Sequence, residues 1–147
     1  MPVTVSPKTI FLVEDNLGDI RLIQEALKEA QTPCEIVVAR DGVAAISQLQ
    51  QPGVPLPDLI LLDLNLPKKD GRQVLAELKA DPRLQTIPVI VLTTSRNEED
   101  ITHSYDLHAN CYIAKSRNLR ELFKIIRGIE AFWLETATLP QSPSAFY

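Results

Sequence analysis

Residues 58–63 read Asp-Leu-Ile-Leu-Leu-Asp, an apolar run that ends at a carboxylate. The strand predicted from it spans 58–62, and similar runs rich in valine and isoleucine lie at 9–13, 35–39, 88–92 and 111–114. Short continuous apolar runs are typical of strands that are buried on both faces, as in a parallel sheet. The sequence therefore predicts five strands of one buried sheet.

Helical segments separate these runs. Apolar residues recur at helical spacing in three of the intervening segments, at Ile20, Ile23, Ala26 and Leu27, at Val43, Ile46 and Leu49, and at Val74, Leu75 and Leu78. Strand followed by helix, repeated along the chain, predicts an α/β fold with a doubly wound parallel sheet. A chain of 147 residues has the size of one domain. We expect an N-terminal arm at 1–7, the domain at 8–134 and a polar tail at 135–147, with no output domain.

Charge and hydropathy limit the classes of partner. The chain has 15 basic and 19 acidic residues, a net charge of −4, which argues against a nucleic-acid-binding surface. No run approaches the roughly 20 apolar residues that span a bilayer, and residues 1–8 contain no apolar signal segment. We therefore expect a cytoplasmic protein that binds neither nucleic acid nor membrane.

Chemically active side chains follow four of the predicted strands. The first run ends in Glu14 and Asp15, the third in Asp63, the fourth in Thr93, and the fifth reaches Lys115. Because the carboxyl ends of parallel strands lie along one edge of a sheet, we expect these side chains to meet there. Three carboxylates and one ammonium sum to −2, and like charges about 4 Å apart repel by about 4 kcal/mol at an effective dielectric near 20. The acids would take up protons or move apart unless a cation held them, and their hard oxygen ligands favour Mg²⁺.

Each of these residues also has an ordinary structural explanation. An aspartate after a strand is often the N-cap of the next helix, and threonine is favoured within strands. An acidic pair is common at a strand end, and Lys115 could face the solvent. The convergence of four strands on one edge favours a functional site over these separate explanations.

Together with the turn Leu-Pro-Lys-Lys-Asp-Gly at 66–71, these residues resemble the receiver domain of bacterial two-component response regulators over residues 8–133. The resemblance implies a flavodoxin-like sheet of strand order 2-1-3-4-5 flanked by five helices. It also implies that Asp63 is the phosphoacceptor. The residues that would hold Mg²⁺ are Glu14, Asp15, Asp63 and, through its backbone carbonyl, Asn65.

The same resemblance assigns the switch residues. Lys115 would pair with the phosphoryl oxygens, and Thr93, with Thr94 beside it, would move to hydrogen-bond them. Tyr112 matches the aromatic residue that rotates inward as the switch closes. A carboxylate is a weak nucleophile, so the protein assists mainly by positioning and charge neutralisation. Movement of Thr93 would bias the loop at 94–100, which predicts a signalling protein and not an enzyme.

A finer resemblance concerns the partner. Residues 103–108 and 115–116, the proline-rich loop 51–57 and the ending 130–134 resemble response regulators that serve cyanobacterial phytochromes. This implies that the phosphodonor is a histidine kinase controlled by red and far-red light. Ser116 stands where most receivers have a proline after a cis bond. We predict that the Lys115–Ser116 bond is also cis, so that Lys115 reaches the site, although such a bond costs roughly 2.5–4 kcal/mol before a non-proline residue.

The last helix, predicted at 118–134, has more apolar surface than a helix covering a sheet needs. The side expected to face the sheet consists of Leu119, Leu122, Phe123, Ile126 and Trp133. The stripe expected to stay exposed consists of Ile125, Ile129 and Phe132. Exposed contiguous apolar surface usually marks an interface, so we predict a homodimer through this stripe. The alternative is that the tail covers the stripe with Leu139, Phe146 and Tyr147.

Two other functions fit part of the pattern. A phosphatase of the haloacid dehalogenase type also uses a strand-end aspartate as its nucleophile. That class needs a second aspartate two residues later, where this chain has Asn65, and typically a cap domain. The second alternative is a receiver-like interaction module that is never phosphorylated, although all the phosphorylation residues are present.

Overall fold

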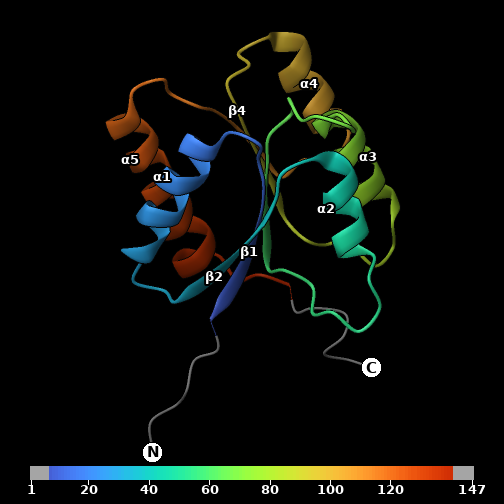
Figure 1. Ribbon diagram of the computed structural model, residues 1–147, viewed down its shortest axis with the longest axis horizontal. Coiled ribbons are helices and arrows are strands. Elements are labelled where there is room, and N and C mark those ends of the chain that lie inside the picture. Colours follow the sequence, from blue (N-terminus) through green and yellow to red (C-terminus); the bar gives the residue numbers. More distant parts are fainter. Residues whose placement is uncertain (1–6, 141–147) are drawn as a thin grey trace, which may run out of the picture.

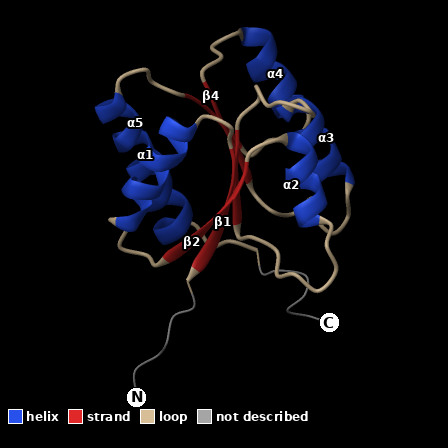
Figure 2. Ribbon diagram, in the orientation of Figure 1, coloured by secondary structure: helices blue, strands red, loops and turns tan. Residues whose placement is uncertain are grey.

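The computed structural model describes residues 7–140 as a five-stranded parallel sheet of order β2-β1-β3-β4-β5 between two layers of helices (Figures 1 and 2). The strands are β1 (Lys8–Val13), β2 (Cys34–Ala39), β3 (Leu59–Leu62), β4 (Val89–Thr93) and β5 (Cys111–Ala114). The α-helices are α1 (Leu17–Lys28), α2 (Gly42–Leu49), α3 (Gly71–Ala80), α4 (Glu98–Asp106) and α5 (Leu119–Ile129). A π-helical segment, η1 (Glu130–Thr136), continues α5. The predicted fold class and strand order are confirmed.

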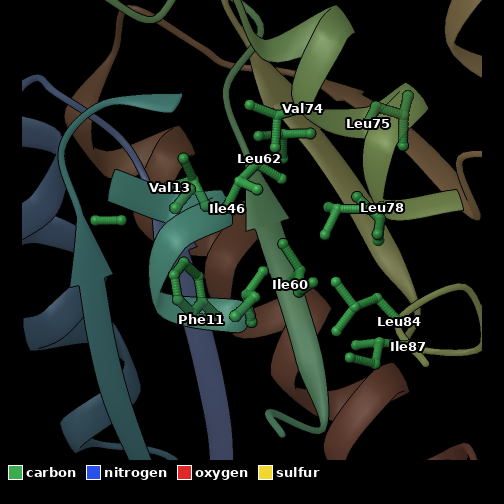
Figure 3. Packing of buried hydrophobic residues seen from close by; sticks show 14 of the residues in the cluster. Phe11, Val13, Ile46, Ile60, Leu62, Val74, Leu75, Leu78, Leu84 and Ile87 are labelled. Atoms are coloured by element: carbon green, nitrogen blue, oxygen red, sulfur yellow. The ribbon is translucent and has the colours of Figure 1, made fainter. Parts of the chain in front are cut away.

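The sheet separates two apolar cores. Helices α1 and α5 cover one face, and α2, α3 and α4 lie on the other (Figure 1). Alternate strand residues point to opposite faces, so Phe11 and Val13 enter the core under α2 and α3, whereas Ile10 and Leu12 enter the core under α1 and α5. Figure 3 shows the first core, with Ile46 and the side chains of α3 packed on β1 and β3. None of the helices in the described part is long and apolar enough to cross a membrane.

Burial on both faces holds for the central strands and fails at the edges. All residues of β3 and β4 are buried, which explains their unbroken apolar sequences. The edge strands β2 and β5 have a neighbour on only one side, so most of their residues are partly exposed, with Val37 at 44%. In α2 the apolar residues that face the core are Ala45, Ile46 and Leu49. Val43, which has the same helical spacing as Ile46 and Leu49, is 50% exposed.

The buried face of α5 is rotated from the predicted one. Leu122, Ile126 and Ile129 are buried in the core shared with α1, and their spacing of four and three residues forms one stripe. Leu119 lies in the first turn of the helix and is 64% exposed. The predicted buried face counted Leu119 among its residues and was therefore centred on the wrong side of the helix. The prediction that Ile129 lies on an exposed stripe is therefore wrong. Ile125 is partly buried against the same core, and Phe132 is 54% exposed as predicted.

Regular backbone continues past the predicted start of the tail at 135. The π-helical segment η1 ends at Thr136, and Leu139 packs partly buried against the core under α1 and α5. The alternative to a dimer was that the tail folds back over α5, and the position of Leu139 against this core agrees with that alternative. Phe146 and Tyr147, and residues 1–6 of the predicted arm, lie outside the described residues.

The start of α3 lies directly against the backbone that follows β3. The backbone N–H of Gly71 donates to the carbonyl of Leu64 at 2.8 Å. A Cβ atom at Gly71 would lie 2.2 Å from the carbonyl oxygen of Asp63 and 2.5 Å from the Cα atom of Leu64. No side chain fits at this distance from backbone atoms, so only glycine allows α3 to begin beside Asp63.

We expect Gly71→Ala to lower the free energy of unfolding by about 3 kcal/mol, because two backbone segments must move apart. Gly128→Ala is the control, since nothing lies within 4 Å of a Cβ at this residue of α5. Helix propensity predicts that the control gains about 0.5–1 kcal/mol. Urea unfolding followed by circular dichroism measures both, and a Gly71→Ala protein as stable as wild type would contradict the contact.

Candidate functional site

The three predicted carboxylates meet at the carboxyl ends of β1 and β3. Glu14 and Asp15 follow β1, and Asp63 follows β3, where its backbone N–H donates to the carbonyl of Val13 at 3.0 Å. Carboxylate oxygens of the three acids lie within 4.8 Å of one another. Glu14 and Asp63 are buried, whereas Asp15 is exposed. A cluster of hard oxygen donors of this kind fits a divalent cation such as Mg²⁺.

Lys115 supplies the positive charge of the cluster. Its ammonium group donates to the Glu14 carboxylate, to Asp19 Oδ2 at 2.8 Å and to Asp63 Oδ2 at 3.3 Å. Burial alone would lower the pKa of Lys115. The hydrogen bonds with Asp19 and Glu14 and the charges of Glu14 and Asp63 outweigh burial, so the pKa is raised. Lys115 is therefore positively charged at neutral pH, at this edge of the sheet.

The environment of Glu14 shows that one ammonium does not balance the acids. Burial and the charge of Asp63 raise the pKa of Glu14 to about 7, although the bond to Lys115 acts in the opposite direction. Glu14 Oε2 also accepts hydrogen bonds from the backbone N–H groups of Asp15 at 3.0 Å and Asn16 at 3.3 Å. A divalent cation among these carboxylates would offset the remaining negative charge.

Thr93, the last residue of β4, presents a buried hydroxyl group with no hydrogen-bond partner among the described residues. A buried polar group left without a partner costs roughly 1–3 kcal/mol. The Thr93 carbonyl accepts the backbone N–H of Lys115 at 2.6 Å, which fixes the two residues side by side at the site. Thr94, the next residue, is exposed. Thr93 thus has an unused donor at the strand edge where the carboxylates meet.

A polar network connects the loop after β4 with α3 and β5. Asp100, in the first turn of α4, accepts a hydrogen bond from Ser95 Oγ at 2.6 Å. Two guanidinium nitrogens of Arg72, on α3, contact Asp100 Oδ1 at 2.8 and 3.0 Å. Tyr112 donates its hydroxyl group to the Ser95 carbonyl at 2.9 Å. Ser95 lies two residues after Thr93, so this network begins close to the end of β4.

The backbone at the end of β5 differs from the prediction. The Lys115–Ser116 bond is trans, as are all peptide bonds of the described residues, so the predicted cis bond is wrong. Without a proline at 116 a trans bond avoids the roughly 2.5–4 kcal/mol cost of the cis form. Lys115 reaches all its partners from the trans geometry, and Ser116 Oγ donates to Glu121 at 2.7 Å.

Sequence reasoning did not identify Asp19, Arg72 or Asp100 as site residues. Asp19 stands four residues after Asp15, so a signal existed: an acid in the first turn of α1 lies at the same edge of the sheet as the strand-end acids. Arg72 and Asp100 are 28 residues apart on different helices, and no local pattern relates them.

The model of the response regulator receiver domain family matches residues 10–127. The chain belongs to this family. Phosphoryl acceptance is the standard function of receiver domains.

Receivers similar to this one are known from cyanobacteria. The chain is 61% identical over 138 residues to response regulator Rcp1 of Synechocystis sp., covering 91% of this receiver and 94% of Rcp1. The phosphorylated cyanobacterial phytochrome response regulator RcpA matches with a TM-score of 0.90 and 64% identity, over 92% of this receiver and 100% of the RcpA chain. The Mn²⁺-bound form of Rcp1 matches with a TM-score of 0.88 and 61% identity, over 91% and 99% of the two chains.

The structure of the receiver places the residues predicted for its site as follows. Glu14, Asp15 and Asp63 form one cluster with Lys115, and Thr93 lies at the adjoining strand end. The Asn65 backbone N–H donates to Asp63 Oδ1 at 3.2 Å. Coordination of a metal by the Asn65 carbonyl, the roles of Thr94 and Tyr112 and contact of Thr93 with a phosphoryl group stay predictions.

Thr93→Val tests whether the threonine hydroxyl is unpaired in the receiver before phosphorylation. Valine keeps the shape and removes the unpaired donor, so we expect the free energy of unfolding to rise by about 1 kcal/mol. Ser104→Ala is the control, because the buried Ser104 hydroxyl donates to the Asp100 carbonyl at 2.7 Å. It should lose about 1 kcal/mol. A loss of stability in Thr93→Val, measured by urea unfolding, would show that the hydroxyl already has a partner.

Proposed function

We propose that this receiver accepts a phosphoryl group on Asp63 and signals through a change of its surface. The observation that carries the proposal is that two features occur at the same edge of the sheet. The buried Asp63 carboxylate is bonded to Lys115, and the buried Thr93 hydroxyl has no partner among the described residues. A phosphoryl group brings about two negative charges and strong acceptor oxygens, and the Lys115 ammonium and the Thr93 hydroxyl are suitable donors for them. We further propose that Mg²⁺ is the metal, held by Glu14, Asp15, Asp63 and the Asn65 carbonyl.

The chemistry follows from the contacts of Asp63. One carboxylate oxygen of Asp63 forms a bond to phosphorus as the bond between phosphorus and the phosphohistidine nitrogen of the kinase breaks. The electron pair of the broken bond stays on that nitrogen. Asp63 is a weak nucleophile, so its fixed position and the charges around it provide the acceleration. Mg²⁺, when bound, neutralises the phosphoryl oxygens. Lys115 supplies a second positive charge from its present contact with Asp63.

The output would begin at Thr93. Its hydroxyl would donate to a phosphoryl oxygen, with Thr94 as the neighbouring donor, and the shift would displace Ser95. Ser95 is bonded through its hydroxyl to Asp100 and through its carbonyl to Tyr112. Loss of these bonds would free the start of α4 and let Tyr112 turn inward. The signalling surface is then α4, β5 and the loop between β4 and α4.

We infer that the phosphodonor is a histidine kinase of the phytochrome type. Support comes from the likeness to Rcp1 and to RcpA, of which the second is a phytochrome response regulator. A histidine kinase draws its phosphoryl group from ATP, so the cytoplasm is the proposed location. In this role the receiver is a phosphoacceptor that assists its own phosphorylation and dephosphorylation, and not an enzyme with a separate substrate.

The two alternative functions have less support. A phosphatase would need a general acid two residues after Asp63, but Asn65 has an amide there, and it contacts Asp63 through its backbone N–H. A module that is never phosphorylated would have no use for the unpaired hydroxyl of Thr93 or for a lysine buried among acids.

Intact-mass spectrometry tests the phosphoacceptor. Acetyl phosphate and Mg²⁺ should add the mass of one phosphoryl group to wild type and none to Asp63→Asn, and a metal chelator should prevent the addition. Asp58→Asn is the control, because Asp58 lies at the opposite end of β3, where it accepts the Thr9 N–H at 2.8 Å. It should be labelled like wild type. Labelling of Asp63→Asn on another residue would overturn the assignment.

We also propose a homodimer through α5 and η1. The exposed Phe132 ring packs edge-on against Trp133, with centroids 5.3 Å apart, which holds it in place. Ile125 lies seven residues before Phe132, about two helical turns away, and is partly exposed. Ile129 belongs to the core and contributes nothing, so Ile125 and Phe132 would meet their own copies across a two-fold axis.

Phe132→Glu should give a monomer that is still labelled by acetyl phosphate, because a charge at the dimer axis would face its own copy. Leu119→Glu is the control: Leu119 is 64% exposed at the other end of α5 and should leave the dimer intact. Light scattering at micromolar concentration measures both. A wild-type protein that is monomeric with and without phosphorylation would contradict the dimer.

A further inference from the structure

Asp19 is an acidic side chain whose position in α1 does not explain its contacts. It lies in the first turn of α1, where Asn16 caps the helix by accepting the Asp19 N–H at 3.0 Å. An acid at this position commonly bonds back to the N–H of the capping residue. Here the Asn16 N–H donates to Glu14 instead, at 3.3 Å. The Asp19 carboxylate reaches Lys115 at 2.8 Å, a residue 96 positions away.

The ammonium group of Lys115 has no free donor. It has three N–H bonds, and the carboxylates of Glu14, Asp19 and Asp63 accept all three. On a phosphorylated Asp63, one phosphoryl oxygen can take over the contact that the Asp63 carboxylate now makes with Lys115. A second phosphoryl oxygen can bind Lys115 only if Glu14 or Asp19 is released. The three side chains differ in exposure, at 2% for Glu14, 9% for Asp63 and 21% for Asp19. Releasing the buried Glu14 would leave an unpaired charge, whereas a released Asp19 returns to water, so Asp19 is the contact that gives way.

We propose that Asp19 is a positioning residue that holds Lys115 before phosphorylation and competes with the phosphoryl group for its ammonium. The inference rests on the proposed phosphorylation of Asp63. Before transfer, Asp19 draws part of the Lys115 charge toward α1 and leaves Glu14 and Asp63 more available to a cation. After transfer, a second phosphoryl oxygen can reach Lys115 only by displacing Asp19. Asp19 thereby sets how far the site favours its phosphorylated form.

Removing the Asp19 charge should have opposite effects on two ligands. In Asp19→Asn the ammonium is shared by two carboxylates, so it pairs more closely with Glu14 and Asp63 and opposes Mg²⁺ more strongly. A phosphoryl mimic no longer displaces a charged competitor and meets one fewer negative charge. Binding of Mg²⁺ alone should weaken, and binding of beryllofluoride in saturating Mg²⁺ should tighten. A residue that only supported α1 would change both affinities in the same direction or neither.

Isothermal titration calorimetry measures both affinities on the full chain. We expect Asp19→Asn to bind beryllofluoride about fivefold more tightly than wild type, and Mg²⁺ alone more weakly. Asp19→Ala removes the charge without leaving an amide and should behave in the same way. Glu25→Gln is the matched control, because it removes one charge from the same helix, and its exposed carboxylate pairs with Lys28 at 3.1 Å. Both affinities of the control should stay at wild-type values.

The outcomes separate this inference from the proposed function. Tighter beryllofluoride binding in both Asp19 variants, and not in Glu25→Gln, supports the role of Asp19. Equal or weaker beryllofluoride binding in folded Asp19 variants overturns it. If wild type then still binds beryllofluoride and Asp63→Asn does not, the assignment of Asp63 as the phosphoacceptor stands. Wild type that fails to bind beryllofluoride in Mg²⁺ would reject the proposed function and this inference with it.

Discussion

The contact between one ammonium group and the strand-end acids is the interaction on which this edge of the sheet depends. Lys115 leaves the end of β5, and its side chain reaches across the end of β4 to acids that follow β1 and β3. Carboxylates about 4 Å apart repel by about 4 kcal/mol at an effective dielectric near 20, so the ends of β1 and β3 would separate or take up protons without it. Removing one partner from such a buried group costs about 3–5 kcal/mol. Lys115 thus stabilises the ends of β1 and β3 and is also positioned to bind a ligand at the site.

The interior of the fold could be predicted from the sequence, because burial on both faces leaves a continuous apolar pattern. The central strands and the buried residues of α1 and α3 follow that pattern. The errors fall where exposure is decided by distant neighbours. Val37 is exposed because β2 is an edge strand, and Leu119 and Ile129 exchange their expected environments because α5 is rotated over the sheet. A helical wheel orders residues around an axis but does not show which side meets the sheet.

The site could be predicted because topology, and not local sequence, brings its parts together. Parallel strands deliver their last residues to one edge, so Glu14, Asp63 and Lys115 converge although up to 101 residues separate them. What escaped prediction depends on the direction of single side chains: Asp19 turns away from its own helix cap. The cis bond was carried over from proline-containing receivers, and its energetic basis disappears when serine replaces proline.

The glycine at the start of α3 gives the site an uneven stiffness. The backbone of Asp63 lies against the start of α3 at a distance that admits no side-chain atom, so α3 would oppose a shift of Asp63 in that direction. The side toward β4 differs, because there Thr93 has an unpaired hydroxyl and the following loop is held by a few polar contacts. We therefore expect a structural change at Asp63 to be accommodated on the side of β4. In the proposed mechanism, the close contact with α3 would direct any displacement that follows phosphorylation of Asp63 toward β4 and the loop after it.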